Sequence, residues 1–451
     1  MKRLLSIVLV IVMVAVLGAC SSDKGKGGSS EGSIEAVGSK YAEGLMLPQL
    51  ENTEVSWLLS AGYDEHKELD SETSPDDLYQ SWKVWEETYG TKVDVQVVAW
   101  DSFTSYLSTA AASGDMPDIV YGGTTWFPSW PAKGLVQPLD DYIDFSDDMW
   151  NKEIMEQLMW DGKNYVAYAQ QPENFYICYN KTKFELAGET TPLEHWNAGT
   201  WNWTQFVKTA LNMTDKANNE YGYTGWNLGF SKCIYPIVDI ADDGTLKSNL
   251  TSSNVKRWFT EVYNLYHSGA ARTDNDKGNY LTTFPAGKDA MIHVSPEEYI
   301  KMQKMLKITG GDEFEVAPSP VFDPNGDTVS KTTTNIYGYS ISAQAANPKG
   351  AAALIELYYK MKNNIEDSFG ELGQFGSYLS EEEKAAIKTA NETVPELNFI
   401  LGFGNAQALF NTQCGDIIYS ANREGSVSSL FDSFNTVLEA ELNEFSGAIG
   451  K

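Results

Sequence analysis

The sequence predicts an α/β protein built as two lobes, and three observations indicate this. The chain has 451 residues, more than a single ordinary hydrophobic core accommodates. From about residue 55, apolar strand-like runs alternate with amphipathic helical segments, the pattern of a mostly parallel sheet with helices on its faces. A new set of such elements begins beyond the stretch DGKNYVAYAQQPENFYICYNK, which favours a second lobe.

The first lobe is predicted from three strands that alternate with two helices. The strands are VSWLLS, KVDVQVVAW and PDIVYGG, which begin at Val55, Lys92 and Pro117. The helices are LYQSWKVWEETYG and FTSYLSTAAASG, and each ends at a glycine, as helices commonly do. The polar stretch 61–75 indicates a loop.

Further elements follow in the second half of the chain. TWNWTQFVKTALNMTD predicts a helix that is entered through Thr200 or Asn202. The remaining predicted elements are the strands YGYTGW, AGKDAMIHV and GYSISA and the helices SSNVKRWFTEVYNLYHSG, NPKGAAALIELYYKMK and SSLFDSFNTVLEAELNEF.

The N-terminus has the pattern of an export signal. Two basic residues precede an apolar run from Leu4 to Val16, as in a secretory signal peptide. The run ends in LGAC, which resembles the bacterial lipobox and implies cleavage before Cys20 and attachment of a lipid with acyl chains such as palmitate. We therefore expect a signal peptide over 1–19, a flexible tether over 20–53 and an extracytoplasmic protein, lipid-anchored to the cell membrane.

Charge and cysteine content exclude several classes of function. The formal net charge of -29 argues against binding to nucleic acid or to an anionic membrane surface. Beyond Cys20 the chain has Cys178, Cys233 and Cys414, which allow at most one disulfide and which we interpret as small buried hydrophobic residues. No cysteine or histidine spacing indicates a zinc site, so we expect no metal and no cofactor.

Six stretches follow one another in a recognisable order: AAASGDMPDIVYGG, AKGLVQPLDDYI, DGKNYVAYAQQPENFYICYNKTKFELAG, HWNAGTWNWTQF, FPAGKDAMIHV and ISAQAANPKGAAALIELYY. In this order, and behind a lipobox, they resemble the extracellular solute-binding proteins of bacterial carbohydrate ABC transporters, the maltose-binding-protein-like group. The similarity extends over nearly all of the mature chain from about Val55.

The resemblance implies a periplasmic-binding-protein-like fold of type II, with a hinge of crossing strands and a ligand cleft between the lobes. It places lobe 1 at 55–167 and 340–393, and lobe 2 at 168–339 and 394–451, with crossings near 166–173, 335–340 and 394–403. The implied function is that of a monomeric binding component, not an enzyme, which captures a sugar or oligosaccharide and delivers it to the permease subunits of an importer.

The same resemblance indicates the residues of the cleft. Sugars present apolar faces to aromatic rings and hydroxyl groups to polar side chains, so a sugar site needs both kinds of residue. The candidates are Tyr63, Asp64, Trp100, Asp101 and Trp126 from lobe 1, Glu173 and Asn174 from the hinge, Trp226 and Glu297 from lobe 2, and Tyr337 at the second crossing. We interpret Trp130, Trp201 and Trp203 as packing residues and Asp118 as a hydrogen-bonding residue at a turn.

Two alternatives remain open. A secreted carbohydrate-active enzyme would need a pair of carboxylates across a cleft, but the chain has no G-x-S-x-G, HExxH, P-loop or dinucleotide-binding motif. The same fold could instead hold a peptide, a polyamine or a metal. Two segments, Asp274–Tyr280 and Asp323–Asp327, resemble the start of calcium-binding loops, but neither reaches a glutamate at the twelfth position, so we interpret them as turns.

Overall fold

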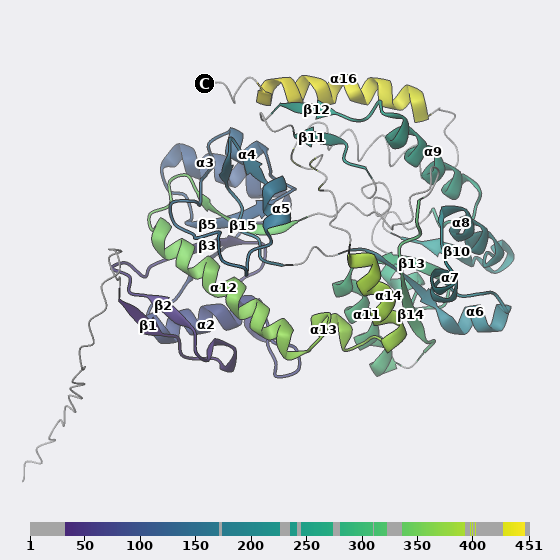
Figure 1. Cartoon of the computed structure of the whole chain (residues 1–451), viewed down its shortest axis with the longest axis horizontal. Coiled ribbons are helices and arrows are strands. Elements are labelled where there is room, and N and C mark those ends of the chain that lie inside the picture. The colour runs from purple at the N-terminus through teal and green to yellow at the C-terminus, as the bar shows by residue number, and fades with distance from the viewer. Residues whose placement is uncertain are drawn as a thin grey trace, which may run out of the picture.

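The structure is a computed structural model of the chain. It describes residues 32–170, 174–225, 235–240, 245–273, 280–309, 311–322, 336–392, 397, 399, 402 and 427–446. Figure 1 shows two groups of elements, each arranged around its own sheet. We call the group around β3, β5 and β15 the first lobe, and the group around β9, β13 and β14 the second lobe.

The first sheet has the strand order β4-β3-β5-β15-β6. Strand β3 runs parallel to β4 and β5, whereas β15, which comes from far along the chain, pairs antiparallel with β5 and β6. The three strands predicted for the first lobe are confirmed, and the sheet is mixed because β15 is inserted beside them. The strands are β3 (Ser56–Leu59), β4 (Asp94–Val97), β5 (Ile119–Gly123), β6 (Val136–Gln137) and β15 (Tyr337–Ser342).

Helices cover this sheet, and the two predicted from the first half of the chain are confirmed. Helix α2 (Asp77–Tyr89) begins where the Asp76 side chain accepts a hydrogen bond from the backbone N–H of Tyr79, and it ends at Gly90, whose φ is 72°. The other helical segments are η2 (Trp100–Ser102), α3 (Phe103–Ser113), α4 (Ser129–Ala132), α5 (Lys152–Gln157) and α12 (Pro348–Ser368). Helices α2 and α12 pack against each other.

The stretch 61–75, predicted as a loop, contains the short helix α1 (Tyr63–Leu69). The Glu65 carboxylate accepts a hydrogen bond from the backbone N–H of Gly62 at 3.2 Å, which satisfies a donor at the helix start. No residue of α1 is buried. An apolar periodicity therefore could not reveal this helix, because no helix face packs into the core.

Asp118 ties β3, β5 and α12 together, which confirms its interpretation as a hydrogen-bonding residue. Its buried carboxylate accepts hydrogen bonds from the backbone N–H and the hydroxyl of Ser56, each at 2.9 Å, and from the backbone N–H of Asn347 at 2.7 Å. Asn347 in turn caps α12 through its side chain. A buried carboxylate with three donors is a satisfied structural group.

The segment 32–53 is folded, which corrects the prediction that the flexible tether extends to residue 53. It forms β1 (Ser33–Glu35), η1 (Lys40–Ala42) and β2 (Met46–Pro48), with β1 and β2 antiparallel. Buried Tyr41, Ala42 and Leu47 join the core beside α2 and α12. The polar Gly/Ser-rich composition ends near Ser33, and the apolar residues after it provide surface that packing can bury.

The second sheet has the order β10-β13-β9-β14. Strands β10 and β13 are parallel, and β9 is antiparallel to both β13 and β14. The strands are β9 (Tyr176–Asn180), β10 (Tyr221–Thr224), β13 (Asp289–Val294) and β14 (Phe314–Pro318). Its helices are α6 (Lys181–Ala187), α7 (Pro192–Asn197), α8 (Trp203–Asn212), α9 (Ser253–His267), α10 (Tyr280–Thr283), α11 (Pro296–Thr309), α13 (Gly373–Gly376) and α14 (Glu381–Asn391).

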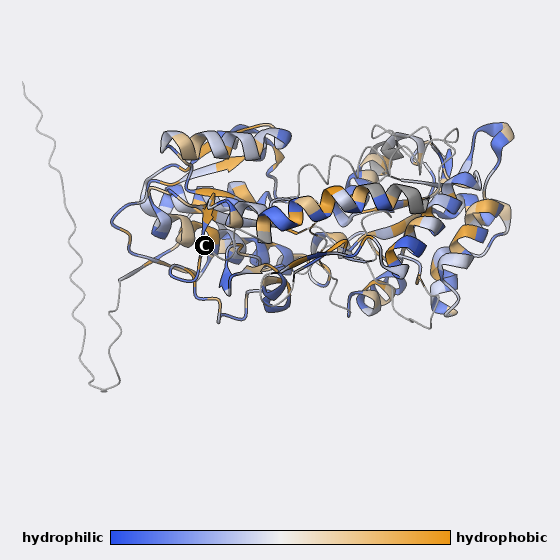
Figure 2. Cartoon of the chain, turned by 90° about the horizontal axis from the view of Figure 1, so that it is seen from above, coloured by the Kyte–Doolittle hydropathy of each residue, from blue (hydrophilic) through white to orange (hydrophobic). Residues whose placement is uncertain are grey.

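The predicted second-lobe strands and helices are present within the described residues. Of the two proposed entries into α8, Asn202 is the cap, because its side chain accepts a hydrogen bond from the backbone N–H of Gln205. Trp201 and Trp203 are buried in the core, as predicted. The helices show mixed apolar and polar residues in Figure 2, as expected of helices that cover a sheet with one face.

Smaller elements complete the fold. They are β7 (Met159–Trp160), β8 (Lys163–Asn164), η3 (Lys216–Asn218), β11 (Val238–Ile240), β12 (Leu246–Ser248) and the C-terminal helix α16 (Val427–Ser446). Helix α16 lies against β12 and α9.

The two lobes are joined by crossing segments. Ala167 forms a β-bridge with Tyr339, and the hydroxyl of Tyr359 donates to the carbonyl of Ala167 at 2.7 Å. A later crossing runs from α12 through α13 to α14, and α14 contacts β14 and α7. The predicted boundary at residue 393 assigns α14 to lobe 1, whereas the structure packs this helix on the second sheet.

Candidate ligand-binding site

The carboxyl ends of parallel strands bring several predicted site residues to one edge of the first sheet. Strands β3, β4 and β5 end at the same edge, where open α/β sheets commonly bind ligands. Strand β15 begins at this edge, with Tyr337 opposite Gly123. Trp100 follows β4 and Trp126 follows β5. The topology therefore places Trp100, Trp126 and Tyr337 together.

Trp100 and Tyr337 form an exposed aromatic pair. Their side chains are 40% and 46% exposed, unusually open for rings of this size. The ring centroids lie 5.6 Å apart, and the planes meet at 73°. Two ring faces that meet nearly at a right angle can contact an apolar ligand surface from two sides. Asp101, next to Trp100, is also exposed and supplies a carboxylate.

Trp126 lies beneath this pair and is only 5% exposed. It is stacked between Tyr121, with ring centroids 5.5 Å apart, and Trp130, at 5.0 Å. Its ring also lies 5.1 Å from that of Trp100. Trp126, predicted as a cleft residue, thus packs beneath Trp100 with little of its own surface exposed. Trp130 is fully buried, which confirms its interpretation as a packing residue.

Gly123 allows β15 to approach closely enough to form this edge. Its φ is 116°, and a Cβ atom there would lie 1.9 Å from the carbonyl oxygen of Ile336. Thr124 donates its backbone N–H to that carbonyl at 3.1 Å, and the backbone N–H of Ile336 donates to the Thr124 hydroxyl at 3.1 Å. This double contact fixes Tyr337 relative to the loop that carries Trp126.

Tyr121 belongs to the same cluster, although sequence reasoning did not select it. Its ring lies 5.4 Å from Trp100 and stacks on Tyr339 at 5.7 Å. Burial raises the pKa of Tyr121, while hydrogen bonds with Ser60 oppose the shift. A tyrosine in mid-strand usually indicates core. Tyr121 lies two residues before Gly123 and therefore on the same face of β5. Only this spacing could have indicated that Tyr121 belongs to the aromatic cluster.

Tyr63 packs on α2 and not on the aromatic pair. Its ring stacks on Trp82 with centroids 5.7 Å apart, its hydroxyl donates to Glu86 at 3.3 Å, and Nζ of Lys92 lies 3.9 Å from the ring centroid. Burial, together with the carboxylate of Glu86, raises the pKa of Tyr63 to about 12. Asp64, the next residue, is exposed on α1.

Of the predicted residues of the second lobe and hinge, the structure describes Asn174 and Glu297, which lie on different elements. The buried Asn174 donates its side-chain N–H to the Oδ1 atom of Asn391 at 2.7 Å, and Tyr176 donates its hydroxyl to the same oxygen at 3.1 Å. Glu297 is exposed in the first turn of α11, where it forms an ion pair with Lys301 at 2.6 Å.

Several other predictions fall outside the described residues. They concern Cys20, Glu173, Trp226, Cys233, Cys414 and the two segments that resemble calcium loops. Cys178 is described and is buried with a free thiol, as expected of a small hydrophobic residue.

At the facing edge of the second sheet, sequence reasoning missed the buried His293. Its Nε2 lies 3.0 Å from the hydroxyl of Ser319, which donates to the carbonyl of Phe175 at 2.8 Å. Because that hydroxyl proton points to Phe175, the Nε2 atom of His293 carries the proton and donates it to the serine. Burial lowers the pKa of His293 to about 3, so the ring is neutral. This chain connects β13 to the crossing segment.

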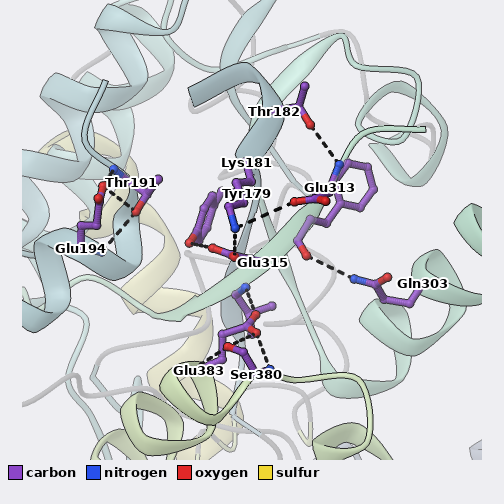
Figure 3. A network of polar contacts seen from close by, with 12 residues as sticks. Tyr179, Lys181, Thr182, Thr191, Glu194, Gln303, Glu313, Glu315, Ser380 and Glu383 are labelled. Carbon is purple, nitrogen blue, oxygen red and sulfur yellow. Dashed lines mark hydrogen bonds and ion pairs between the residues drawn. The ribbon is translucent and has the colours of Figure 1, made fainter. Parts of the chain in front are cut away.

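A polar network joins β9 to β14 and fastens α14 to the second sheet (Figure 3). Lys181 forms an ion pair with Glu315 at 2.7 Å, and the hydroxyl of Tyr179 donates to the same carboxylate. The carboxylate of Glu383 accepts hydrogen bonds from the backbone N–H groups of Val316 at 2.8 Å and Ser380 at 2.7 Å. The partners of these groups lie within the fold, so the network has a structural role.

The described part of the chain offers neither a metal-binding cluster nor a membrane-spanning helix. No group of three or more His, Cys, Asp or Glu side chains there is arranged to hold a metal ion. None of the helices described is both long and apolar enough to span a membrane.

Residues 70–365 match the sequence profile of the bacterial extracellular solute-binding proteins, a stretch that covers more than half of the chain. The chain belongs to this family. A curated relative in Brucella abortus, named as a binding protein, is 30% identical over 113 residues, and the match spans 27% of that relative's length. Activity and partners are therefore not carried over from it.

Solved structures show that this solute-binding protein has the two-lobed periplasmic-binding-protein fold. The galacto-N-biose/lacto-N-biose I-binding protein of the ABC transporter from Bifidobacterium longum, in complex with lacto-N-biose, has a TM-score of 0.67 and 18% identity, covering 88% of this chain and 99% of that one. The sugar-binding protein MalE from Xanthomonas citri has a TM-score of 0.66 and 15% identity, covering 88% of this chain and 100% of that one.

Proposed function

We propose that this protein is the substrate-binding component of an ABC importer, that it captures a sugar or oligosaccharide between its lobes, and that it delivers this ligand to the permease subunits. The observation that carries the proposal is the exposed pair of Trp100 and Tyr337 at the ligand-binding edge of the first sheet. A family of solute-binding proteins and neighbours of the same fold that hold sugars support it.

Recognition of a sugar follows from the chemistry of this edge. The C–H faces of a sugar ring stack on Trp100 and Tyr337, and Asp101 accepts hydrogen bonds from its hydroxyl groups. The ring of Trp126 packs beneath Trp100 and holds it in place. Tyr63, Asp64, Glu173, Asn174, Trp226 and Glu297 remain predicted cleft residues.

A thermal-shift screen with glucose, maltose, maltotetraose and lacto-N-biose tests the proposal. A ligand that binds only the folded state stabilises it by about 2.7 kcal/mol at a hundredfold excess over its Kd. We expect at least one sugar to raise the melting temperature, and recovery of that sugar unchanged. A sugar recovered in cleaved form would favour the carbohydrate-active enzyme instead.

We further propose that a lipid on Cys20 anchors the protein outside the cell membrane, because LGAC resembles a lipobox. Replacing Cys20 with Ala should abolish incorporation of a labelled fatty acid and release the protein from the membrane fraction. Unchanged labelling of the variant would contradict the anchor without bearing on sugar binding.

A further inference from the structure

Three parts of the fold meet at the hydroxyl group of Ser74. This residue lies in the loop between α1 and α2, in the first lobe. Its Oγ atom lies 3.3 Å from Nζ of Lys304 and 3.2 Å from Nε2 of Gln374, and both nitrogens donate to it. Lys304 is on α11, and Gln374 is on α13. A hydroxyl oxygen has two lone pairs and can accept both hydrogen bonds.

One donor, Lys304, is fixed to the second lobe, and the other, Gln374, lies where the lobes join, because its backbone N–H donates to the Glu366 carboxylate of α12 at 3.0 Å. Helix α11 packs beside β13 and α13. Phe375, next to Gln374, stacks on Tyr176 of β9 with centroids 5.4 Å apart, and it meets Tyr299 of α11 edge-on at 5.7 Å. These rings belong to the hydrophobic core of the second sheet. Lys304 therefore moves with that sheet, and the Gln374 side chain reaches the same hydroxyl from the junction between α12 and the second lobe.

The acceptor is fixed to the first lobe. The backbone N–H of Ser71 donates to the carbonyl of Ser74 at 3.1 Å, which closes the loop. The carboxylate of Asp70 accepts from the backbone N–H of Asp76 and from the side chain of Gln80 on α2, with the shortest distance to each at 2.9 Å. The loop is thus built on α2 independently of the second lobe.

The chain next to this contact has the conformation of a hinge. Gly370 and Leu372, between α12 and α13, and Gly373, the first residue of α13, have φ values of 83°, 62° and 56°. A left-handed backbone conformation is rare for a leucine. Hinge motions change the φ and ψ angles of a few residues at the ends of elements such as these. The distances of a contact beside such a junction therefore change when the angle between the lobes changes.

We propose that the Ser74 hydroxyl is an interlobe latch that holds the open arrangement of the lobes and thereby weakens sugar binding; the inference rests on the proposed function. In this arrangement Trp100 and Tyr337 are 40% and 46% exposed, so the proposed site is uncovered. Covering them requires the second lobe to move relative to the first. Hydrogen bonds are lost beyond about 3.5 Å, so a small rotation breaks the latch.

The test compares Ser74→Ala with a matched control, Thr73→Ala, which removes an exposed hydroxyl from the adjacent residue. Interlobe distances are measured without ligand, by electron paramagnetic resonance between labelled unnatural amino acids at Ser108 on α3 and Leu186 on α6. We expect Ser74→Ala to add shorter distances to the distribution, and Thr73→Ala to leave it as in the wild type. An unchanged distribution in Ser74→Ala would overturn the latch.

Affinity provides the second measurement. Loss of the latch raises the population of the closed arrangement, so Ser74→Ala should bind maltotetraose or lacto-N-biose, whichever the wild type binds, about two- to tenfold more tightly. Weaker binding would mean that the contact belongs to the closed arrangement and would also overturn the latch. If the wild type binds none of the four sugars of the thermal-shift screen, the proposed function is contradicted, whereas the ligand-free distances still decide whether the latch exists.

Discussion

Trp100 is the ring proposed to stack on the sugar. Because it is partly exposed, its replacement should affect sugar affinity more than the free energy of unfolding. Replacing Trp100 with Ala removes a ring that is 40% exposed, so the free energy of unfolding should fall by less than it does for a buried tryptophan. Loss of an aromatic anchor should weaken sugar binding by about 2 kcal/mol, which is roughly thirtyfold. Calorimetric titration beside thermal melting measures both quantities.

Trp130 is the matched control, because it is a buried tryptophan of the same cluster. Trp130→Ala should cost about 3 to 5 kcal/mol of folding stability, unlike Trp100→Ala. Wild-type affinity in Trp100→Ala would contradict the assignment of this ring to the site.

His66 should make the stability of the protein depend on pH. Burial lowers the pKa of His66, but the hydrogen bond and charge of Asp76, with the charges of Asp77 and Glu65, outweigh it and raise the pKa above the usual 6.5. The folded state therefore binds the His66 proton more tightly than the unfolded state does. The resulting contribution to the free energy of unfolding is complete below pH 6.5 and is lost as the pH rises through the raised pKa of His66. Denaturant unfolding from pH 6.5 upward should show this loss in the wild type. His66→Gln should remove that part of the slope, and an identical slope would refute the assignment.

At the level of single residues, the sequence predicts the exposed pair but not what surrounds it. Trp100 and Tyr337 follow from their places beside strands, a matter of topology. Tyr63 also follows a strand, but its ring stacks on Trp82 of α2. No local sequence pattern reveals such a pairing. Tyr121 and His293 depend on contacts between distant segments, which periodicity does not contain.

The N-terminal segment 32–53 should contribute to folding stability as an element. Leu47 in β2 is 3% exposed, so Leu47→Ala should cost about 2 to 5 kcal/mol. Its neighbour Met46 is 53% exposed, and Met46→Ala should change stability by less than about 0.5 kcal/mol. Chemical denaturation measures both. Equal, small effects would show that the segment is the flexible tether predicted from the sequence.

Among whole elements, those with a clear apolar pattern are the ones that the sequence predicts. The strands from VSWLLS and PDIVYGG and the helices α2, α8, α9 and α12 all bury one face or both. Helix α1 buries no residue and was therefore missed. The antiparallel insertion of β15 beside β5 depends on a pairing across more than 200 residues, which only a family resemblance could suggest.

For the whole molecule, the two-lobed fold predicts that ligand changes the overall shape. The lobes have separate sheets joined by crossing segments, so they can rotate as units. On addition of a bound sugar, small-angle scattering should show a smaller radius of gyration. A sugar that binds tightly and leaves the scattering curve unaltered would count against closure.

The division into lobes could be predicted only in outline. The resemblance placed the lobe 1 boundary at 393, but α14 contacts β14 because its buried Glu383, Ala386 and Ile387 face the second lobe. The sheet that α14 covers depends on how the chain crosses between the lobes after α12, and the local sequence does not specify that crossing.

Binding of an unaltered sugar at the exposed edge of the first sheet is what we propose for this protein. Isothermal titration of the wild type with each sugar of the panel, followed by chromatography of the recovered ligand, tests this directly. We expect binding of one sugar per chain, recovery of that sugar intact, and roughly thirtyfold weaker binding by Trp100→Ala. Absence of binding to every sugar tested, or recovery of a cleaved sugar, would contradict it.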